Sequence, residues 1–219
     1  MGYNSTLLDT QYRCHPYIAD IANKLFYGSR LRNGCDTSER ESLVPGLPHI
    51  VFVDTRGSQE RYGGSIWNKK EAKMCRSIFE RLTRHGIASQ DIGIICFFKE
   101  QVNRIRQELD SQACSDDGDG GGDGESQQSS KSVLVATVDS FQGNEKKVII
   151  LSTSVTSPGS FGSDPNRLNV ALTRATTHLV IVGCAPALAT QRVWANILSH
   201  VRSNAFGRML AAGEPFPIT

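Results

Sequence analysis

The sequence lacks three features that would each have defined its class. No apolar run approaches the ~18 residues of a membrane span, and the N-terminus has neither the basic nor the apolar region of a signal peptide. The six cysteines include no C-x-x-C pair, so neither a zinc site nor a disulfide framework is expected. No G-x-x-x-x-G-K-[ST] occurs either, which leaves the chain without a phosphate-binding loop of its own.

What is present is the composition of an ordinary globular protein, with 39% hydrophobic and 21% charged residues in a chain of 219. We expect an intracellular protein with reduced thiols. The segment from Ser115 to Ser132 is acidic, rich in glycine and almost free of apolar residues, so it cannot offset its ordering entropy. We interpret residues 115–132 as a disordered insertion within a single domain spanning residues 1–219. The remainder is mildly basic, which suits a polyanionic partner.

Strand-like and helix-like segments alternate along the chain. Apolar runs of strand length occupy residues 49–55, 92–98, 133–138, 147–153 and 178–183, and helices are predicted over residues 16–27, 69–85, 99–110, 166–174 and 185–200. The second helix has a start resembling a capping box, with Asn68 and Glu71, and Gly86 supplies its stop. This order predicts an α/β fold with a mostly parallel sheet, helices on both faces, and ligands at the carboxyl ends of the strands.

Three polar segments stand out against this pattern: LDTQYRCHP (8–16), ATVDSFQGNEKKVIILS (136–152) and DPNRLNVALTRA (164–175). In the second, hydroxyl side chains and Gly143 follow a strand directly, which suits contacts to phosphate oxygens. An ordinary turn closed by Asp139 and Gly143 would look the same. In the third, we expect Arg174 in the last turn of a helix, where arginines more often interact with the helix C-terminus than take part in catalysis.

In this order, QYRCHP (11–16), TVDSFQGNEKKVIILS (137–152) and RLNVALTRA (167–175) resemble the late motifs of superfamily 1 helicases of the up-frameshift and senataxin-like group. The resemblance covers nearly the whole chain, and LDTQYRCHP is similar to the GRF-zinc-finger DNA helicases. It implies a three-layer RecA-like fold and the second motor domain of an ATP-driven 5′-to-3′ helicase. Single-stranded nucleic acid would be the partner, and a DNA substrate would favour the nucleus and a role in DNA repair.

The resemblance also implies that ATP with Mg²⁺ lies between two RecA-like domains. The first domain, absent from this sequence, would supply the phosphate loop and the magnesium-binding acids, so no metal ligand is expected here. Tyr12 would stack on adenine. Arg13 and Arg174 would reach the γ-phosphate, where a guanidinium that arrives on domain closure stabilises the charge of the transferring group.

Other positions match the same motifs. Gln142 would sense the γ-phosphate, while Gly143 and Glu145 would contact nucleotide phosphate and ribose. The residues expected between nucleotide and nucleic acid are Thr137, Asp139 and Ser140. The chain departs from many relatives at Asn166, where a second basic residue is common, and in the acidic insertion.

Two alternatives remain open from the sequence. The chain could be a non-catalytic nucleic-acid-binding or adaptor module that kept the fold, or a nucleotide hydrolase completed in trans by another chain. The nucleotide residues retained together favour the motor domain. Because the phosphate loop is missing, we expect negligible ATPase activity from this chain alone. DNA and RNA offer the same phosphates, and no segment distinguishes them.

Overall fold

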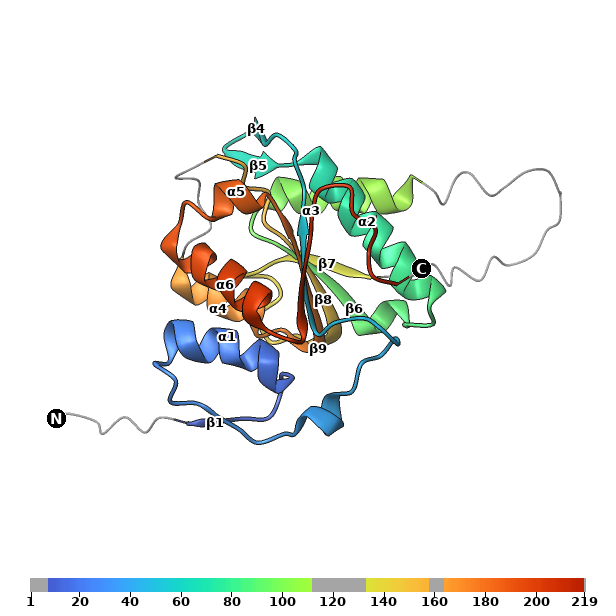
Figure 1. Cartoon of the computed structure of the whole chain (residues 1–219). Helices are drawn as coiled ribbons and strands as arrows, with labels where there is room; N and C mark the ends of the chain where they lie inside the picture. Colours follow the sequence, from blue (N-terminus) through green and yellow to red (C-terminus); the bar gives the residue numbers. More distant parts are fainter. Residues whose placement is uncertain (1–7, 112–132, 158–163, 219) are drawn as a thin grey trace, which may run out of the picture.

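Six parallel strands form the central sheet, in the order β10-β3-β9-β8-β6-β7 (Figure 1). Their bounds are β3 Ile50–Asp54, β6 Ile92–Cys96, β7 Leu134–Thr137, β8 Lys146–Ser152, β9 Ala175–Gly183 and β10 Gly207–Leu210. Strands β3 and β6 are buried along their whole length, as expected of a parallel sheet covered on both faces. The computed structural model describes residues 8–111, 133–157 and 164–218, so the expected insertion at 115–132 lies outside the described residues.

Helices cover both faces of the sheet and divide the core in two (Figure 1). One face packs against α1 (Pro16–Phe26), α4 (Pro165–Leu172), α5 (Ala185–Leu188) and α6 (Arg192–Ser203). The other face packs against α2 (Lys69–Arg84), α3 (Lys99–Asp110) and the C-terminal segment. The three-layer α/β architecture expected from the sequence is therefore confirmed. No helix among the described residues is both long and apolar enough to cross a bilayer.

The smaller elements lie around this sheet. Strands β1 (Thr10–Gln11) and β2 (Arg32–Asn33) form a short parallel pair, and β4 (Glu60–Tyr62) and β5 (Ser65–Trp67) form an antiparallel hairpin. Two short 3₁₀ helices are η1 (Thr37–Arg40) and η2 (Ser89–Asp91). None of these elements is predicted from the sequence, because each has at most four residues.

Two helix boundaries differ from the sequence prediction. The single helix expected over 185–200 is two helices, with the chain turning at residues 189–191 between α5 and α6. Helix α4 ends at Leu172, so Arg174 lies beyond the last turn, directly before β9. The placement of Arg174 within the helix is therefore wrong. By contrast, α2 begins and ends where expected, with Asn68 as its N-cap and Gly86 at a φ of +86°.

Candidate functional site

The connection between β7 and β8 decides where the expected site residues lie. Both strands run parallel to β6, so the chain must return from the carboxyl edge of the sheet to its amino edge between them. Thr137 pairs with Cys96 at the carboxyl ends of β7 and β6, whereas Lys146 pairs with Ala175 at the amino ends of β8 and β9. The seven residues of β8 separate these edges by roughly 20 Å.

The expected residues therefore form two groups. Thr137, at the carboxyl edge, begins the turn that carries Asp139 and Ser140. Glu145 precedes β8 and Arg174 precedes β9, at the amino edge. The sequence predicts ligands at the carboxyl ends of the strands, and the residues of this second group do not lie there. The parallel direction of β7 and β8 causes the separation, because the segment between them crosses from one edge of the sheet to the other.

Phe141 fixes the crossing segment in place. Its side chain is fully buried in the core beneath the sheet. A Cβ on Gly93 in β6 would lie only 2.7 Å from the Phe141 ring, so the missing side chain at Gly93 makes room for it. Sequence reasoning did not single out Phe141, although an aromatic residue inside a run of polar ones was the available signal.

At the amino edge, Arg13 and Arg174 come together from distant segments of the chain. Arg13 Nε forms an ion pair with the Glu145 carboxylate. Arg174 Nε donates to the Val170 carbonyl oxygen at 3.1 Å, and its Nη1 donates to the Asn144 carbonyl oxygen at 3.4 Å. The bonds of Arg174 match the ordinary role of an arginine after a helix, and its guanidinium also lies close enough to Arg13 for the two charges to interact.

This group holds two positive charges and one negative charge, those of Arg13, Arg174 and Glu145. Burial lowers the pKa of Arg174, and the positive charge of Arg13 lowers it further, while Glu145 acts in the opposite direction. Two guanidinium groups thus repel each other beside a single carboxylate that is half exposed. A polyanion at this edge would relieve the repulsion.

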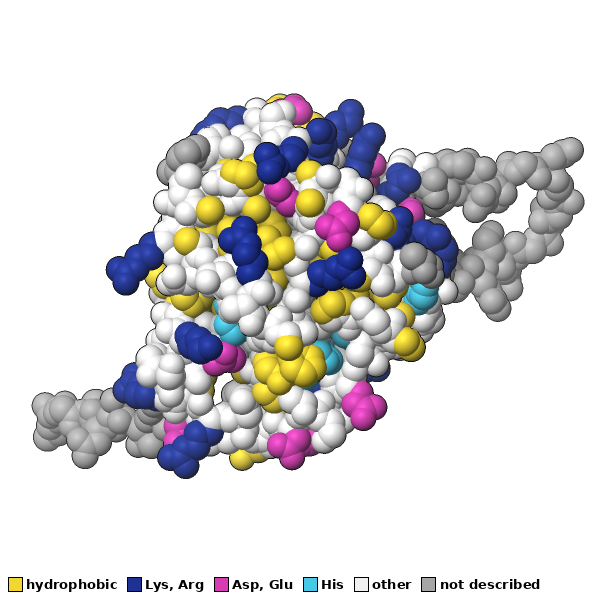
Figure 2. All heavy atoms as spheres, in the orientation of Figure 1, with side chains coloured by type: hydrophobic (Ala, Val, Ile, Leu, Met, Phe, Trp, Pro, Cys, Tyr) yellow, Lys and Arg dark blue, Asp and Glu magenta, His cyan; other side chains and the backbone are white. Residues whose placement is uncertain are grey.

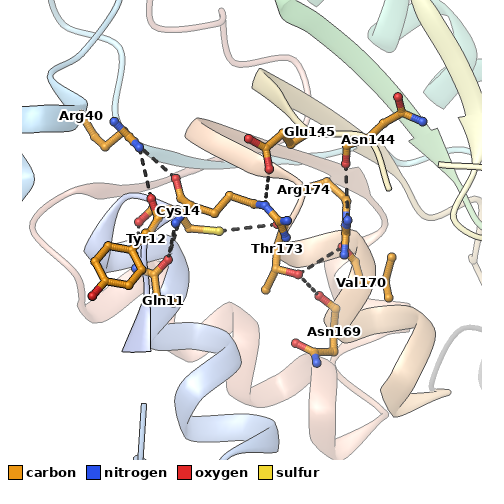
Figure 3. Close-up of polar contacts among 11 residues, drawn as sticks. Gln11, Tyr12, Cys14, Arg40, Asn144, Glu145, Asn169, Val170, Thr173 and Arg174 are labelled. Atoms are coloured by element: carbon orange, nitrogen blue, oxygen red, sulfur yellow. Dashed lines mark hydrogen bonds and ion pairs between the residues drawn. The ribbon is translucent and has the colours of Figure 1, made fainter. Parts of the chain in front are cut away.

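The turn that carries Arg13 is held by three sets of bonds (Figure 3). Gln11 Oε1 accepts from the backbone N–H groups of Arg13 and Cys14, at 3.0 and 2.9 Å. Arg40 donates to the carbonyl oxygens of Tyr12 and Arg13, at 3.2 and 3.3 Å. The backbone N–H of His15 donates to Thr176 in β9 at 2.8 Å. The turn is therefore fixed to the amino edge of the sheet.

Tyr12 is 66% exposed at the outer side of this turn. Its ring lies directly against the backbone of Gly34, where a Cβ would come within 2.1 Å of the ring. Only glycine allows this approach. Gln142 and Gly143 are exposed on the crossing segment, and Gly143 has a φ of +89°. No hydrogen bond within the described residues joins the Gln142 side chain to Arg13 or Arg174.

The carboxyl-edge group is organised by an arginine that sequence reasoning did not assign to the site. Arg167, in the first turn of α4, holds both oxygens of the Asp139 carboxylate, at 3.1 and 3.0 Å, and its Nη2 also donates to the Phe97 carbonyl oxygen at 2.9 Å. Thr137 Oγ1 donates to Ser140 Oγ at 3.0 Å. A basic residue in a first turn opposes the helix dipole, and this was the signal that could have found Arg167.

Helix α4 connects the two groups. Its first turn contacts the carboxyl-edge turn through Arg167, and the residue pair after its last turn, Thr173 and Arg174, lies at the amino edge. Among the described residues, no group of three or more His, Cys, Asp or Glu side chains could hold a metal ion.

The parallel sheet, the helices on both faces and the paired arginines at its amino edge define a RecA-like α/β domain. A protein-family model described as "AAA domain" matches residues 2–186, and the chain belongs to this family. The chain is 36% identical over 208 residues to the 5′-3′ DNA helicase ZGRF1 of Mus musculus, covering 94% of this chain and 11% of that protein. It is 32% identical over 217 residues to the ATP-dependent helicase upf1 of Schizosaccharomyces pombe, covering 94% and 22%.

Among solved structures, the C-terminal domain of a possible DNA helicase from Lactobacillus plantarum has the same fold. The TM-score is 0.52 at 11% identity, over 91% of this chain and 98% of that one. The resemblance to the second RecA-like domain of superfamily 1 helicases is confirmed by these matches together. The chain spans only 11% and 22% of the lengths of the two helicases that it matches in sequence.

Proposed function

We propose that this chain is the second motor domain of an ATP-dependent 5′-to-3′ nucleic-acid helicase, and that residues 1–219 form one domain. It would close over ATP bound to a first RecA-like domain and bind the nucleic-acid backbone at its opposite edge. The observation that carries the proposal is the convergence of Arg13, Glu145 and Arg174 at the amino edge.

The amino edge of the sheet has the side chains to bind a nucleoside triphosphate. The exposed ring of Tyr12 offers a face on which adenine can stack. Arg13 and Arg174 offer two guanidinium groups whose mutual repulsion a γ-phosphate would relieve, and Gln142, Gly143 and Glu145 would make the remaining nucleotide contacts. Bound ATP with Mg²⁺ supplies the phosphoryl group whose transfer to water drives the motor, and we expect the magnesium ligands from the first domain.

The carboxyl edge suits a nucleic-acid backbone. The Ser140 hydroxyl accepts from Thr137 Oγ1, which orients it, and can itself donate to a phosphate oxygen; Asp139, held by Arg167, fixes the turn that presents both residues. The partner in this proposal is single-stranded DNA or RNA. One relative, ZGRF1, is named as a DNA helicase. This favours a DNA substrate, a nuclear setting and a role in DNA repair for the complete protein.

The motor proposal is tested by comparing ATP hydrolysis by this chain alone with hydrolysis by the complete protein. The pure 219-residue chain should show negligible ATPase activity, and the complete protein with both motor domains should show activity that single-stranded nucleic acid stimulates. Turnover by the pure chain, abolished by Arg174→Ala, would contradict the proposal. Activity that appears only when this chain is mixed with a separate first motor domain would favour a hydrolase completed in trans. Nucleic-acid binding by a complete protein without ATPase activity would favour an adaptor.

Strand displacement decides the substrate and the direction. The complete protein should unwind duplexes that carry a 5′ tail and leave those with a 3′ tail intact. Matched DNA and RNA duplexes separate the two substrates, and we expect the DNA duplex to be unwound faster. Unwinding of 3′-tailed duplexes alone would contradict the proposed polarity.

A further inference from the structure

The hairpin of β4 and β5 presents an exposed aromatic side chain that the nucleotide site does not use. Its turn consists of Gly63 and Gly64, both with positive φ (53° and 79°), as a tight two-residue hairpin requires. Tyr62, immediately before this turn, is 69% exposed. Most of the large apolar area of Tyr62 therefore remains in contact with water on an ordered hairpin, which suggests a ligand.

The hairpin is fixed to the carboxyl edge of the sheet at both of its ends. Gln59 and Thr156 exchange two hydrogen bonds, backbone N–H to side chain in each direction, at 2.8 and 3.0 Å. Thr156 follows β8, so this pair anchors the start of the hairpin above that strand. On the other strand, Ser65 Oγ accepts from the backbone N–H of Glu100, in the first turn of α3, at 3.1 Å.

Pairing across the hairpin determines which way Tyr62 faces. Tyr62 lies opposite Ser65, and Trp67 lies on the same side two residues along. That side is turned to α3, because Ser65 contacts Glu100 and the Arg104 guanidinium lies 4.3 Å from the centre of the Trp67 ring. Helix α3 begins directly after β6, the neighbour of β7, whose end carries Thr137. Tyr62 therefore stands on the same edge as the proposed nucleic-acid contacts.

The surroundings of the hairpin are basic. The exposed cations on and beside it are Arg61, Lys69, Lys70, Lys73 and Lys99. Figure 2 shows dark blue side chains gathered at the upper end of the molecule, where Figure 1 places the hairpin and the start of α2. Cations around an exposed aromatic ring are the combination with which proteins bind single strands, the cations taking the phosphates and the ring taking a base.

We propose that Tyr62 stacks on a base of single-stranded nucleic acid bound along the carboxyl edge, while Lys99 binds an adjoining phosphate. This inference rests on the proposed function and adds a base-binding position to it. Stacking on a ring does not depend on base identity, so this position adds affinity without sequence preference. Because the hairpin is already held by Gln59 and Ser65, little ordering entropy is lost on binding.

Titration of the complete protein with a single-stranded oligonucleotide containing 2-aminopurine tests the inference. Tyr62→Ala should weaken binding about tenfold or more and remove the fluorescence change that stacking causes, whereas Tyr62→Phe should retain both. Lys99→Ala should instead make the plot of log affinity against log salt concentration shallower, by the slope of about one phosphate contact. Phe206→Ala, a change of an exposed aromatic at the amino edge, is the matched control and should leave binding unchanged.

Two outcomes overturn the inference in different ways. Equal affinity and equal fluorescence change for wild type and Tyr62→Ala would exclude the stacking position and leave the motor proposal intact. No binding by the wild-type complete protein, to either a DNA or an RNA oligonucleotide, would overturn the proposed function together with this inference. Circular dichroism of each variant establishes that the fold is retained.

Discussion

Arg174 occupies a position that lowers the pKa of its guanidinium group. Burial and the neighbouring Arg13 both disfavour the charged form, yet the guanidinium is already aligned by the carbonyl oxygens of Val170 and Asn144. A side chain held in place before the ligand binds loses little rotamer freedom on binding. In the proposed motor, the energy of a contact between Arg174 and the γ-phosphate would therefore be available to stabilise charge in the transition state.

Replacement of Arg174 should accordingly affect turnover more than nucleotide binding. In the complete protein we expect Arg174→Ala to lower kcat for ATP by about 10³-fold, with a much smaller change in KM. Arg174→Lys should recover little, because an ammonium group lacks the planar fork that meets two oxygens. Arg84→Ala, at the exposed end of α2, serves as the control in steady-state assays. A higher KM with unchanged kcat would show that Arg174 binds ATP without stabilising the transition state.

The residue types of the site could be predicted from the sequence, but their grouping could not. Tyr12, Arg13 and Arg174 were identified by their motifs, and the structure brings the two arginines together as expected. The separation of Thr137 from Glu145 depends on the parallel direction of β7 and β8, which the residues between them do not encode. The hairpin that presents Tyr62 is also missed, because its strands are only three residues long.

At the scale of elements, α4 is the physical connection between the two edges of the sheet. Arg167 in its first turn binds the Asp139 carboxylate and the Phe97 carbonyl, and Arg174 follows its last turn. A short helix with both ends bonded moves as one body. A shift of Arg174 on ATP binding would therefore reach the turn at residues 137–140.

The ion pair between Arg167 and Asp139 should be needed for this coupling. We expect Arg167→Ala to retain basal ATPase activity of the complete protein and to lose most of its stimulation by single-stranded nucleic acid. Asp139→Asn should have the same direction of effect. Because the two side chains act through each other, the double variant should be no worse than the worse single variant. Additive losses in stimulated ATPase activity would contradict this role for the pair.

The crossing segment depends on a second close contact, between Gly93 and Phe141. Gly93→Ala would place a methyl group 2.7 Å from the Phe141 ring, and the buried ring has no free space to move into. We expect a loss of about 1–3 kcal/mol in the free energy of unfolding, measured by urea denaturation. Combining Gly93→Ala with Phe141→Leu should cost less than the sum of the two single changes, and strict additivity would refute the contact.

For the whole molecule, three histidines join the N-terminal segment to the sheet. The rings of His15 and His49 stack at 3.7 Å between centroids, and those of His49 and His178 at 5.1 Å. His15 Nδ1 accepts from the backbone N–H of Tyr17, and His178 Nε2 accepts from that of Leu43. Both acceptors require neutral rings. Burial, together with the neighbouring rings, lowers the pKa of His15 and that of His178 to about 4.

A buried carboxyl group, that of Glu71, has a pKa shifted in the opposite direction to those of the histidines. Glu71 is fully buried at the start of α2, where it accepts from Ser152 Oγ and the backbone N–H of Ser154, both at 2.8 Å. Burial is the largest cause that raises the pKa of Glu71, to about 7, although these hydrogen bonds lower it. The expected capping box is therefore incomplete, because the Glu71 side chain binds the end of β8 instead of the Asn68 backbone N–H, which donates to Gln101.

These groups predict a stability optimum near pH 7. As pH falls from 6.5 to about 4, the unfolded chain takes up protons on His15 and His178 before the folded chain does, so stability is lost. As pH rises from 4.5 to about 7, the unfolded chain releases the Glu71 proton first, so the stability that the neutral carboxyl contributes is lost. Two histidines outweigh one carboxyl below about pH 7, and urea denaturation across this range measures the balance. His15→Asn, which retains a helix N-cap, should make the acid-side slope shallower, whereas Glu71→Gln should make it steeper and abolish the decline above about pH 7. Unchanged slopes in both variants would show that other groups set the pH dependence.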